Sequence, residues 1–217
     1  MSSNTRMART AKLLDDKQLA SVLVRLMMAV NDISVAYDAY EHWERTTGHK
    51  KVARREGGKL YYGRMMHSHV YEALQIIDEI EKSPALMAIV GKCSAKTQSS
   101  FDALAKFLKS SDYTLLCRIR NNTGFHYDDK LTMRMLEKLV RDFPRHRFPH
   151  SLGNAAIDWY FELGDLIIDN ILVREICRVP DQADVRATLE PTLVRLHSMS
   201  VTFLDFAGYF LRHCLKR

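Results

Sequence analysis

The chain has 217 residues, enough for one large domain or two small ones with a sizeable hydrophobic core. Hydrophobic residues make up 47% and charged residues 27%, a balance that argues against disorder, while nine glycines and five prolines disfavour a turn-rich β-sandwich. Thirty-two lysines and arginines against 26 aspartates and glutamates leave a charge of +6, which permits an anionic partner without requiring one.

The four cysteines are far apart and form no CxxC pair, so the sequence predicts neither a disulfide framework nor a zinc site. We therefore expect reduced thiols in a cytoplasmic protein. The N-terminus carries no apolar segment of the kind found in signal peptides, and no window approaches the ~18 uninterrupted apolar residues of a membrane span. HExxH, GxSxG and GxGxxG motifs are absent from the sequence, so we expect no metal, no cofactor and no membrane partner.

Residues 1–14 are predicted to form a flexible leader, and residues 15–217 a single all-helical domain. The domain opens with a long amphipathic helix, because apolar residues recur every three or four positions after Asp15. These residues are Leu19, Val22, Leu23, Leu26, Met27, Val30, Ile33 and Tyr37. Asp15 and Asp16 suit the positive end of the helix dipole, and Thr46, Thr47 and Gly48 are expected to close the helix.

A basic segment follows at residues 48–59, and its composition is typical of a linker between two helices. Two interpretations remain open. The segment is either a solvated loop, or an arm whose cations follow the phosphates of RNA. On the second interpretation the phosphate-binding candidates are Lys50, Lys51, Arg54 and Arg55.

Three further helices are predicted over residues 60–82, 85–92 and 97–109. Ser83 and Pro84 occupy the N-cap and first helical positions of the second of them. A fourth helix begins near Ser111 or Asp112, which are both suitable caps, and it leads into the segment with the strongest functional signal.

This segment combines a helix end with a set of residues suited to phosphate chemistry. Leu115, Leu116 and Ile119 are spaced to face a core, and Gly124 stands where a helix usually stops. A sharp turn there would let His126 fold back toward Arg120. Arginine grips phosphate with two parallel donors, histidine transfers protons near neutral pH, and Asn121 adds a neutral donor and acceptor. Such a group suits metal-independent cleavage of RNA.

The spacing from Arg120 and Asn121 to His126 resembles the signature of the HEPN superfamily (higher eukaryotes and prokaryotes nucleotide-binding). The resemblance implies a helical bundle that often dimerises through this motif, and in many members a metal-independent endoribonuclease used in toxin–antitoxin and phage-defence systems. It also implies that Arg120 and His126 are catalytic and that Asn121 supports them. The flanking residues that contribute to the resemblance are Ile119, Phe125, Tyr127 and Asp128.

After the motif, the sequence predicts an amphipathic helix from Asp129 through Arg141 and then a basic turn with two prolines. Arg145 and Arg147 in this turn are further candidates for binding phosphate, with a plain solvated loop as the alternative. A helix over residues 154–177 follows, and Pro191 is expected to split the last segment into a short and a long helix. The predicted fold is all-α, an up-and-down-like bundle of seven or eight helices.

Three functional hypotheses follow. The first is a homodimeric HEPN-type endoribonuclease that acts on RNA, together with an antitoxin or NTPase partner. The second is a catalytically inactive helical module that binds nucleotide, RNA or a partner protein through the same pocket or the basic loops. The third is a scaffold bundle in which the motif is only a capped helix end.

Overall fold

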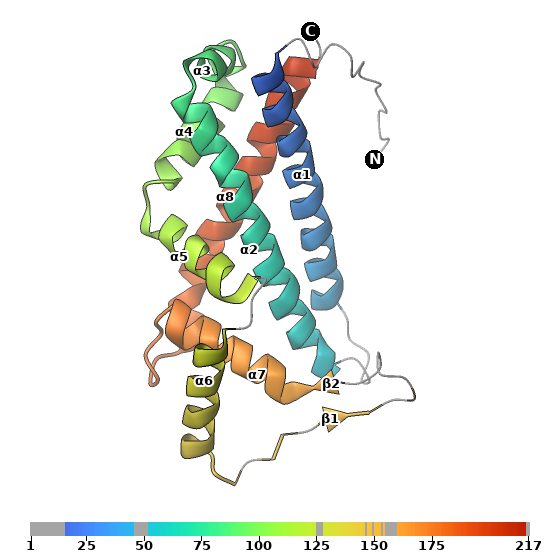
Figure 1. The fold of residues 1–217 in the computed structure, drawn as a ribbon, viewed down its shortest axis with the longest axis vertical. Helices are drawn as coiled ribbons and strands as arrows, with labels where there is room; N and C mark the ends of the chain where they lie inside the picture. The colour runs from blue at the N-terminus through green and yellow to red at the C-terminus, as the bar shows by residue number, and fades with distance from the viewer. Residues whose placement is uncertain are drawn as a thin grey trace.

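The computed structural model describes residues 16–45, 52–124, 128–145, 147–148, 150–152, 154 and 160–215. Within these ranges the chain is all-α apart from one short strand pair, which confirms the predicted fold class (Figure 1). The α-helices are α1 (Lys17–Glu44), α2 (Val52–Lys82), α3 (Pro84–Val90), α4 (Ala95–Phe107), α5 (Ser111–Ile119), α6 (Asp129–Asp142), α7 (Glu162–Asn170) and α8 (Val185–Leu215). Two π-helical turns continue α5 and α7; we call Arg120–Gly124 the first π turn and Ile171–Ile176 the second.

Three long helices, α1, α2 and α8, form the body of the bundle, and α2 contacts most of the other helices (Figure 1). The core lies between them and α4, where Phe101 of α4 meets Phe206 of α8 with ring centroids 5.4 Å apart. Phe206 also stacks on Phe210 at 5.3 Å. Because these rings are fully buried, they contribute much of the apolar area that holds α4 and α8 together.

Ser83 was predicted as an N-cap and Asp16 as a residue at the positive end of the first helix, and both are N-caps. Asp16 is the N-cap of α1, and Ser83 is the N-cap of α3 with Pro84 directly after it. The helix that carries the motif is capped by Ser110, whose side chain accepts from the N–H of Tyr113. The cap therefore lies one residue before the first predicted position.

The predicted linker at residues 48–59 is wrong from residue 52 onward, because α2 already begins at Val52. Gly57 and Gly58 suggested a loop, but both lie inside this helix at close contacts between elements. A Cβ on Gly57 would lie 1.8 Å from Oδ2 of Asp165 in α7, and one on Gly58 would lie 2.5 Å from the indole ring of Trp43. The glycines therefore make room for neighbouring side chains instead of ending a helix.

The expected break at Pro191 is also wrong, because α8 runs through this residue without interruption. Proline removes one helical hydrogen bond and crowds the preceding turn. Here the turn before it has its own support: Asp184 accepts from the N–H of Ala187, and Thr188 N–H donates to the Asp184 carbonyl at 3.0 Å. Pro191 itself is exposed, so its ring displaces no core side chain.

The helix predicted over residues 154–177 begins later, at Glu162. Tyr160 and Phe161 instead form β2 (Tyr160–Phe161), which pairs antiparallel with β1 (His150–Ser151). The register places His150 opposite Phe161, and their rings stack with centroids 6.5 Å apart. Aromatic residues favour such cross-strand pairs, and this preference outweighs the helical pattern here.

One helix among the described residues, α1, is long and apolar enough to cross a membrane by length and composition. Its most apolar window has a mean hydropathy of 1.6, and 33% of that window is buried inside the protein. A core helix of a soluble protein meets the same criterion. The sequence prediction of no membrane span thus remains a prediction.

Candidate functional site

The candidate site lies where α5 passes into the first π turn. Leu115, Leu116 and Ile119 are buried as predicted, and the described helical run reaches Gly124, the residue expected to stop it; the residues directly after it lie outside the described ranges. The last turn differs from the expected α-helix, because it is a π turn. Its polar side chains bond back to the preceding turn: Thr123 Oγ1 donates to the carbonyl of Ile119 at 2.8 Å. Single π turns within helices are frequent at functional sites.

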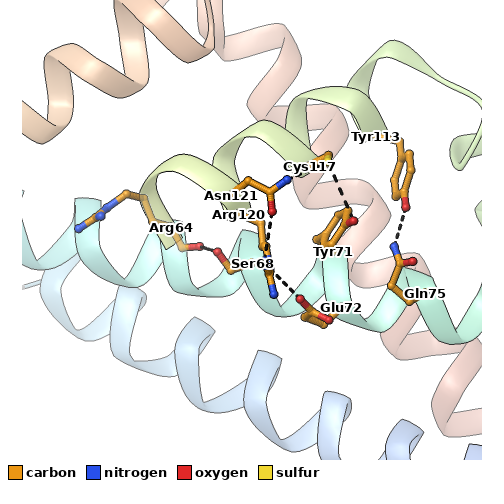
Figure 2. Close-up of polar contacts among 9 residues, drawn as sticks. All are labelled: Arg64, Ser68, Tyr71, Glu72, Gln75, Tyr113, Cys117, Arg120 and Asn121. Atoms are coloured by element: carbon orange, nitrogen blue, oxygen red, sulfur yellow. Dashed lines mark hydrogen bonds and ion pairs between the residues drawn. The ribbon is translucent and has the colours of Figure 1, made fainter. Parts of the chain in front are cut away.

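A buried arginine of α2 holds this turn in place. Arg64 NH1 donates to the carbonyl oxygen of Thr123 at 2.5 Å, and both residues are buried. The carbonyls at the end of a helix lack intrahelical partners and carry partial negative charge, so a cation placed there stabilises the end. Ser68 Oγ in turn donates to the carbonyl of Arg64 (Figure 2). Sequence reasoning missed Arg64, whose only signal was a charge among buried positions of an amphipathic helix.

Arg120, the first residue of the π turn, is held by two oxygens. Its Nε donates to Oε1 of Glu72 in α2 at 2.8 Å, and its NH1 donates to Oδ1 of Asn121 at 3.1 Å (Figure 2). The Arg120 side chain is 36% exposed and that of Glu72 is 49% exposed. NH2 has no hydrogen bond to a described residue. Sequence patterns did not indicate Glu72 as a partner of Arg120, because the two residues are 48 positions apart.

A chain of polar contacts runs from Asn121 away from the arginine. Asn121 Nδ2 lies 3.4 Å from Cys117 Sγ, which lies 4.0 Å from the Tyr71 hydroxyl. Tyr71 stacks on Tyr113 with ring centroids 5.7 Å apart, and the Tyr113 hydroxyl accepts from Gln75 Nε2 at 2.6 Å. Figure 2 shows these side chains in one row between α2 and α5.

The Tyr71 phenol is a very weak acid. Its partial burial, followed by its hydrogen bond with Cys117, raises its pKa to about 12. Tyr71 therefore remains protonated at neutral pH. The row consequently orders the amide of Asn121 through hydrogen bonds between neutral groups.

Of the predicted catalytic residues, the structure brings Arg120 and Asn121 together, whereas His126 lies outside the described residues. Lys50 and Lys51 lie outside them too, as does the side chain of Arg54.

The described basic candidates do not join the site. Arg55 is paired with Glu56, 3.3 Å from its Oε1, and it lies 17 positions before Glu72 on α2, about 25 Å along the helix axis. Arg145 and Arg147 are exposed in the segment after α6, away from α5 (Figure 1).

The electrostatics around Arg120 differ from the positive cleft that the motif suggested. Glu72 pairs with the guanidinium of Arg120, so Arg120 brings no uncompensated positive charge to the described part of the site. In the described part of the chain, no group of three or more histidine, cysteine, aspartate or glutamate side chains is arranged to hold a metal ion. The arrangement can orient an anion through one open guanidinium donor, with a carboxylate and an amide fixing the plane of that group.

No family model, curated protein or solved structure matches the chain.

Proposed function

We propose that the protein is a metal-independent endoribonuclease of HEPN type, which cuts RNA by attack of the 2′-hydroxyl on the neighbouring phosphate. One observation carries the proposal. Arg120 is fixed at Nε and NH1 by Glu72 and Asn121, on a π turn braced by Arg64, and its NH2 has no hydrogen bond to a described residue. A guanidinium held in a fixed plane is suited to stabilising the charge that develops on a phosphate during attack.

In this mechanism Arg120 contacts a non-bridging phosphate oxygen, and His126 moves protons. His126 takes the proton of the 2′-hydroxyl or gives one to the leaving 5′-oxygen, and its copy in a second chain performs the other step. The products are a 2′,3′-cyclic phosphate and a 5′-hydroxyl. DNA lacks the nucleophile and remains uncut.

Glu72 has a positioning role. It does not touch the reacting atoms, but its ion pair sets the direction of the guanidinium and also competes with phosphate for it. Glu72→Gln keeps an oxygen at the Nε position while removing the charge, so we expect a lower KM for RNA with little change in kcat. Glu72→Ala removes both, and we expect kcat to fall. If both variants changed KM and kcat in the same way, this role of Glu72 would be contradicted.

The proposal includes RNA as substrate, a homodimer in which two motifs share one cleft, and a toxin or phage-defence setting with an antitoxin or NTPase partner. It is supported by the resemblance of the motif and by the ordered arginine, and the dimer supplies the second histidine and additional positive charge that a single chain lacks.

The test is incubation of the purified protein with mixed RNA in EDTA, beside an Arg120→Ala/His126→Ala variant. Arg25→Ala is a matched control. Arg25 pairs with Glu79 of the same helix α2 at 2.6 Å, and the two side chains are 39% and 38% exposed. We expect cleavage by the wild type and the Arg25 variant and none by the double variant. Cleavage that EDTA abolishes, or that the double variant retains, would refute the proposal.

The neutral Arg120–Glu72 pair also favours a second candidate, a catalytically inactive module that binds nucleotide, RNA or a partner protein. This candidate predicts no cleavage by any variant and weaker RNA or nucleotide binding by Arg120→Ala than by Arg25→Ala, measured by fluorescence anisotropy. The salt dependence of binding distinguishes this module from a scaffold, since affinity that comes from phosphate contacts falls as the salt concentration rises.

A further inference from the structure

Helix α1 exposes a regular row of side chains on the face turned away from the bundle. The row advances by four and three residues in alternation, and each member is exposed. We call it the outer stripe: Lys17, Ser21, Val24, Met28, Asn31, Val35, Asp38 and His42. The opposite face of α1 packs on α2 and α8 through buried residues such as Leu23, Leu26 and Ile33. In Figure 1 α1 lies at the edge of the bundle.

The centre of the outer stripe is apolar although it faces solvent. Val24 is 46%, Met28 57% and Val35 68% exposed, and Val35 is the most exposed large hydrophobic side chain in the described part of the chain. A spacing of 3.5 residues per turn is the seam of a helix that packs against another helix. Asn31 lies between Met28 and Val35 on this seam, so three of its four central residues are apolar.

The outer stripe is complementary to itself when two copies run antiparallel. Val24 then faces Val35 of the second copy, Met28 faces its Asn31, and Ser21 faces its Asp38. In this register Lys17 faces His42 of the second copy and lies one helical turn from its Asp38, so each lysine is near a carboxylate of the other stripe. A parallel pair would instead place lysine beside lysine and aspartate beside aspartate, and such like-charge contacts are costly.

We propose that α1 docks antiparallel on α1 of a second copy of this chain, about a two-fold axis near the middle of the outer stripe. The seam from position 17 to position 42 is about 38 Å long. Antiparallel helix dipoles also favour this orientation over the parallel one. A lipid bilayer is the rival occupant of the same face, and it is disfavoured by Lys17, Asn31 and Asp38 within the outer stripe.

This interface is separate from the candidate site. Helices α1 and α5 approach α2 from different sides, so pairing through α1 leaves the first π turn accessible (Figure 1). The inference therefore holds or fails independently of ribonuclease activity.

The first test is sedimentation equilibrium on the full chain, comparing the wild type with Val35→Glu. Val140→Glu on α6 is the matched control, since Val140 is 56% exposed and lies on another helix. We expect association by the wild type and the control, and a dimer Kd raised on the order of 100-fold by Val35→Glu, because a carboxylate is buried unpaired. A wild type that stays monomeric up to about 100 µM, the range of weak complexes, would overturn the proposal. Equal association by Val35→Glu would overturn it too.

The second test measures the relative orientation of the two α1 helices by disulfide formation between Val24→Cys and Val35→Cys chains. The wild type shows how much cross-linking comes from the native cysteines. An antiparallel pair predicts rapid cross-linking in a mixture of the two variants and slow cross-linking of each alone. The reverse result would mean parallel pairing and overturn the proposal. If the wild type were monomeric and sedimented with phosphatidylcholine vesicles, and the Val35→Glu variant did not sediment with them, the outer stripe would be a lipid-binding face instead.

Discussion

Lowering the pH should destabilise the fold through one histidine of α2. His67 is largely buried, and its Nδ1 lies 2.8 Å from the carbonyl oxygen of Gly63, one turn earlier. A carbonyl only accepts, so Nδ1 carries the proton and Nε2 is the bare nitrogen of a neutral ring. Nε2 has no partner among the described residues. Burial, aided by the nearby His197, lowers the pKa of His67 to about 4.

The magnitude follows from the difference between the folded and unfolded chains. Below pH 6.5, the ordinary value, the unfolded chain binds a proton that His67 in the folded protein refuses, so the free energy of unfolding falls as the pH drops toward 4. With about 1.4 kcal/mol for each pKa unit, the loss is about 2 kcal/mol at pH 5 and about 3 kcal/mol at pH 4 and below. Above pH 6.5 the group has no effect.

Urea unfolding at pH 7 and pH 5, followed by circular dichroism, measures this loss. The comparison is with His67→Gln, which keeps a hydrogen-bonding side chain but has nothing to protonate. We expect the wild type to lose about 2 kcal/mol more than the variant between the two pH values. The buried carboxyl of Asp169, whose pKa is raised by burial, acts in the opposite direction in both proteins and cancels in the difference. Equal losses would refute the assignment of His67 as a buried neutral base.

Three further predictions concern the backbone and the core, each measured by urea unfolding at pH 7. Gly58→Ala should destabilise the fold by about 1 kcal/mol, because overpacking against the ring of Trp43 outweighs the helix propensity gained. Gly208→Ala should stabilise it by about 1 kcal/mol, because a Cβ there meets nothing within 4 Å. A stability change of the same sign in both variants would contradict the close contact at Gly58. Arg178→Gly should stabilise by about 1 kcal/mol, since Arg178 has a φ of 59°, and an unchanged stability would mean that its side chain compensates. Phe203→Ala should cost about 3–5 kcal/mol from the buried core, and a cost under about 1 kcal/mol would contradict its packing.

The ion pair between Arg120 and Glu72 determines how a phosphate can bind at the candidate site. Within one chain the guanidinium is ordered but neutralised, so a phosphate must either displace Glu72 or use the open NH2. Additional positive charge from a second motif would favour the phosphate over the carboxylate. Activity should therefore depend on protein concentration if the motif works as a dimer, and a rate per chain that is independent of concentration would contradict a shared cleft.

Patterns along the chain were sufficient for the fold class and most helix ends. The period of apolar residues predicted α1, α4 and α6 to within a few residues, because burial of one face is decided locally by spacing. Asp16 and Ser83 indicated helix starts for the same reason, since the side chain of each accepts a hydrogen bond from the first turn of its own helix. The motif could be found because Arg120 and Asn121 are neighbours in sequence.

Contacts between residues far apart in the sequence decided the start of α2 and the partners of the side chains at the candidate site. The sequence could not distinguish a linker from a helix at Gly57 and Gly58, because only the tertiary structure brings Asp165 and Trp43 against them. It likewise could not assign Arg64 to the π turn or Glu72 to Arg120, since both contacts span more than 45 positions. Spacing determines which face of a helix is buried. The element that covers this face, and the charge that meets each side chain, depend on how the helices pack against one another.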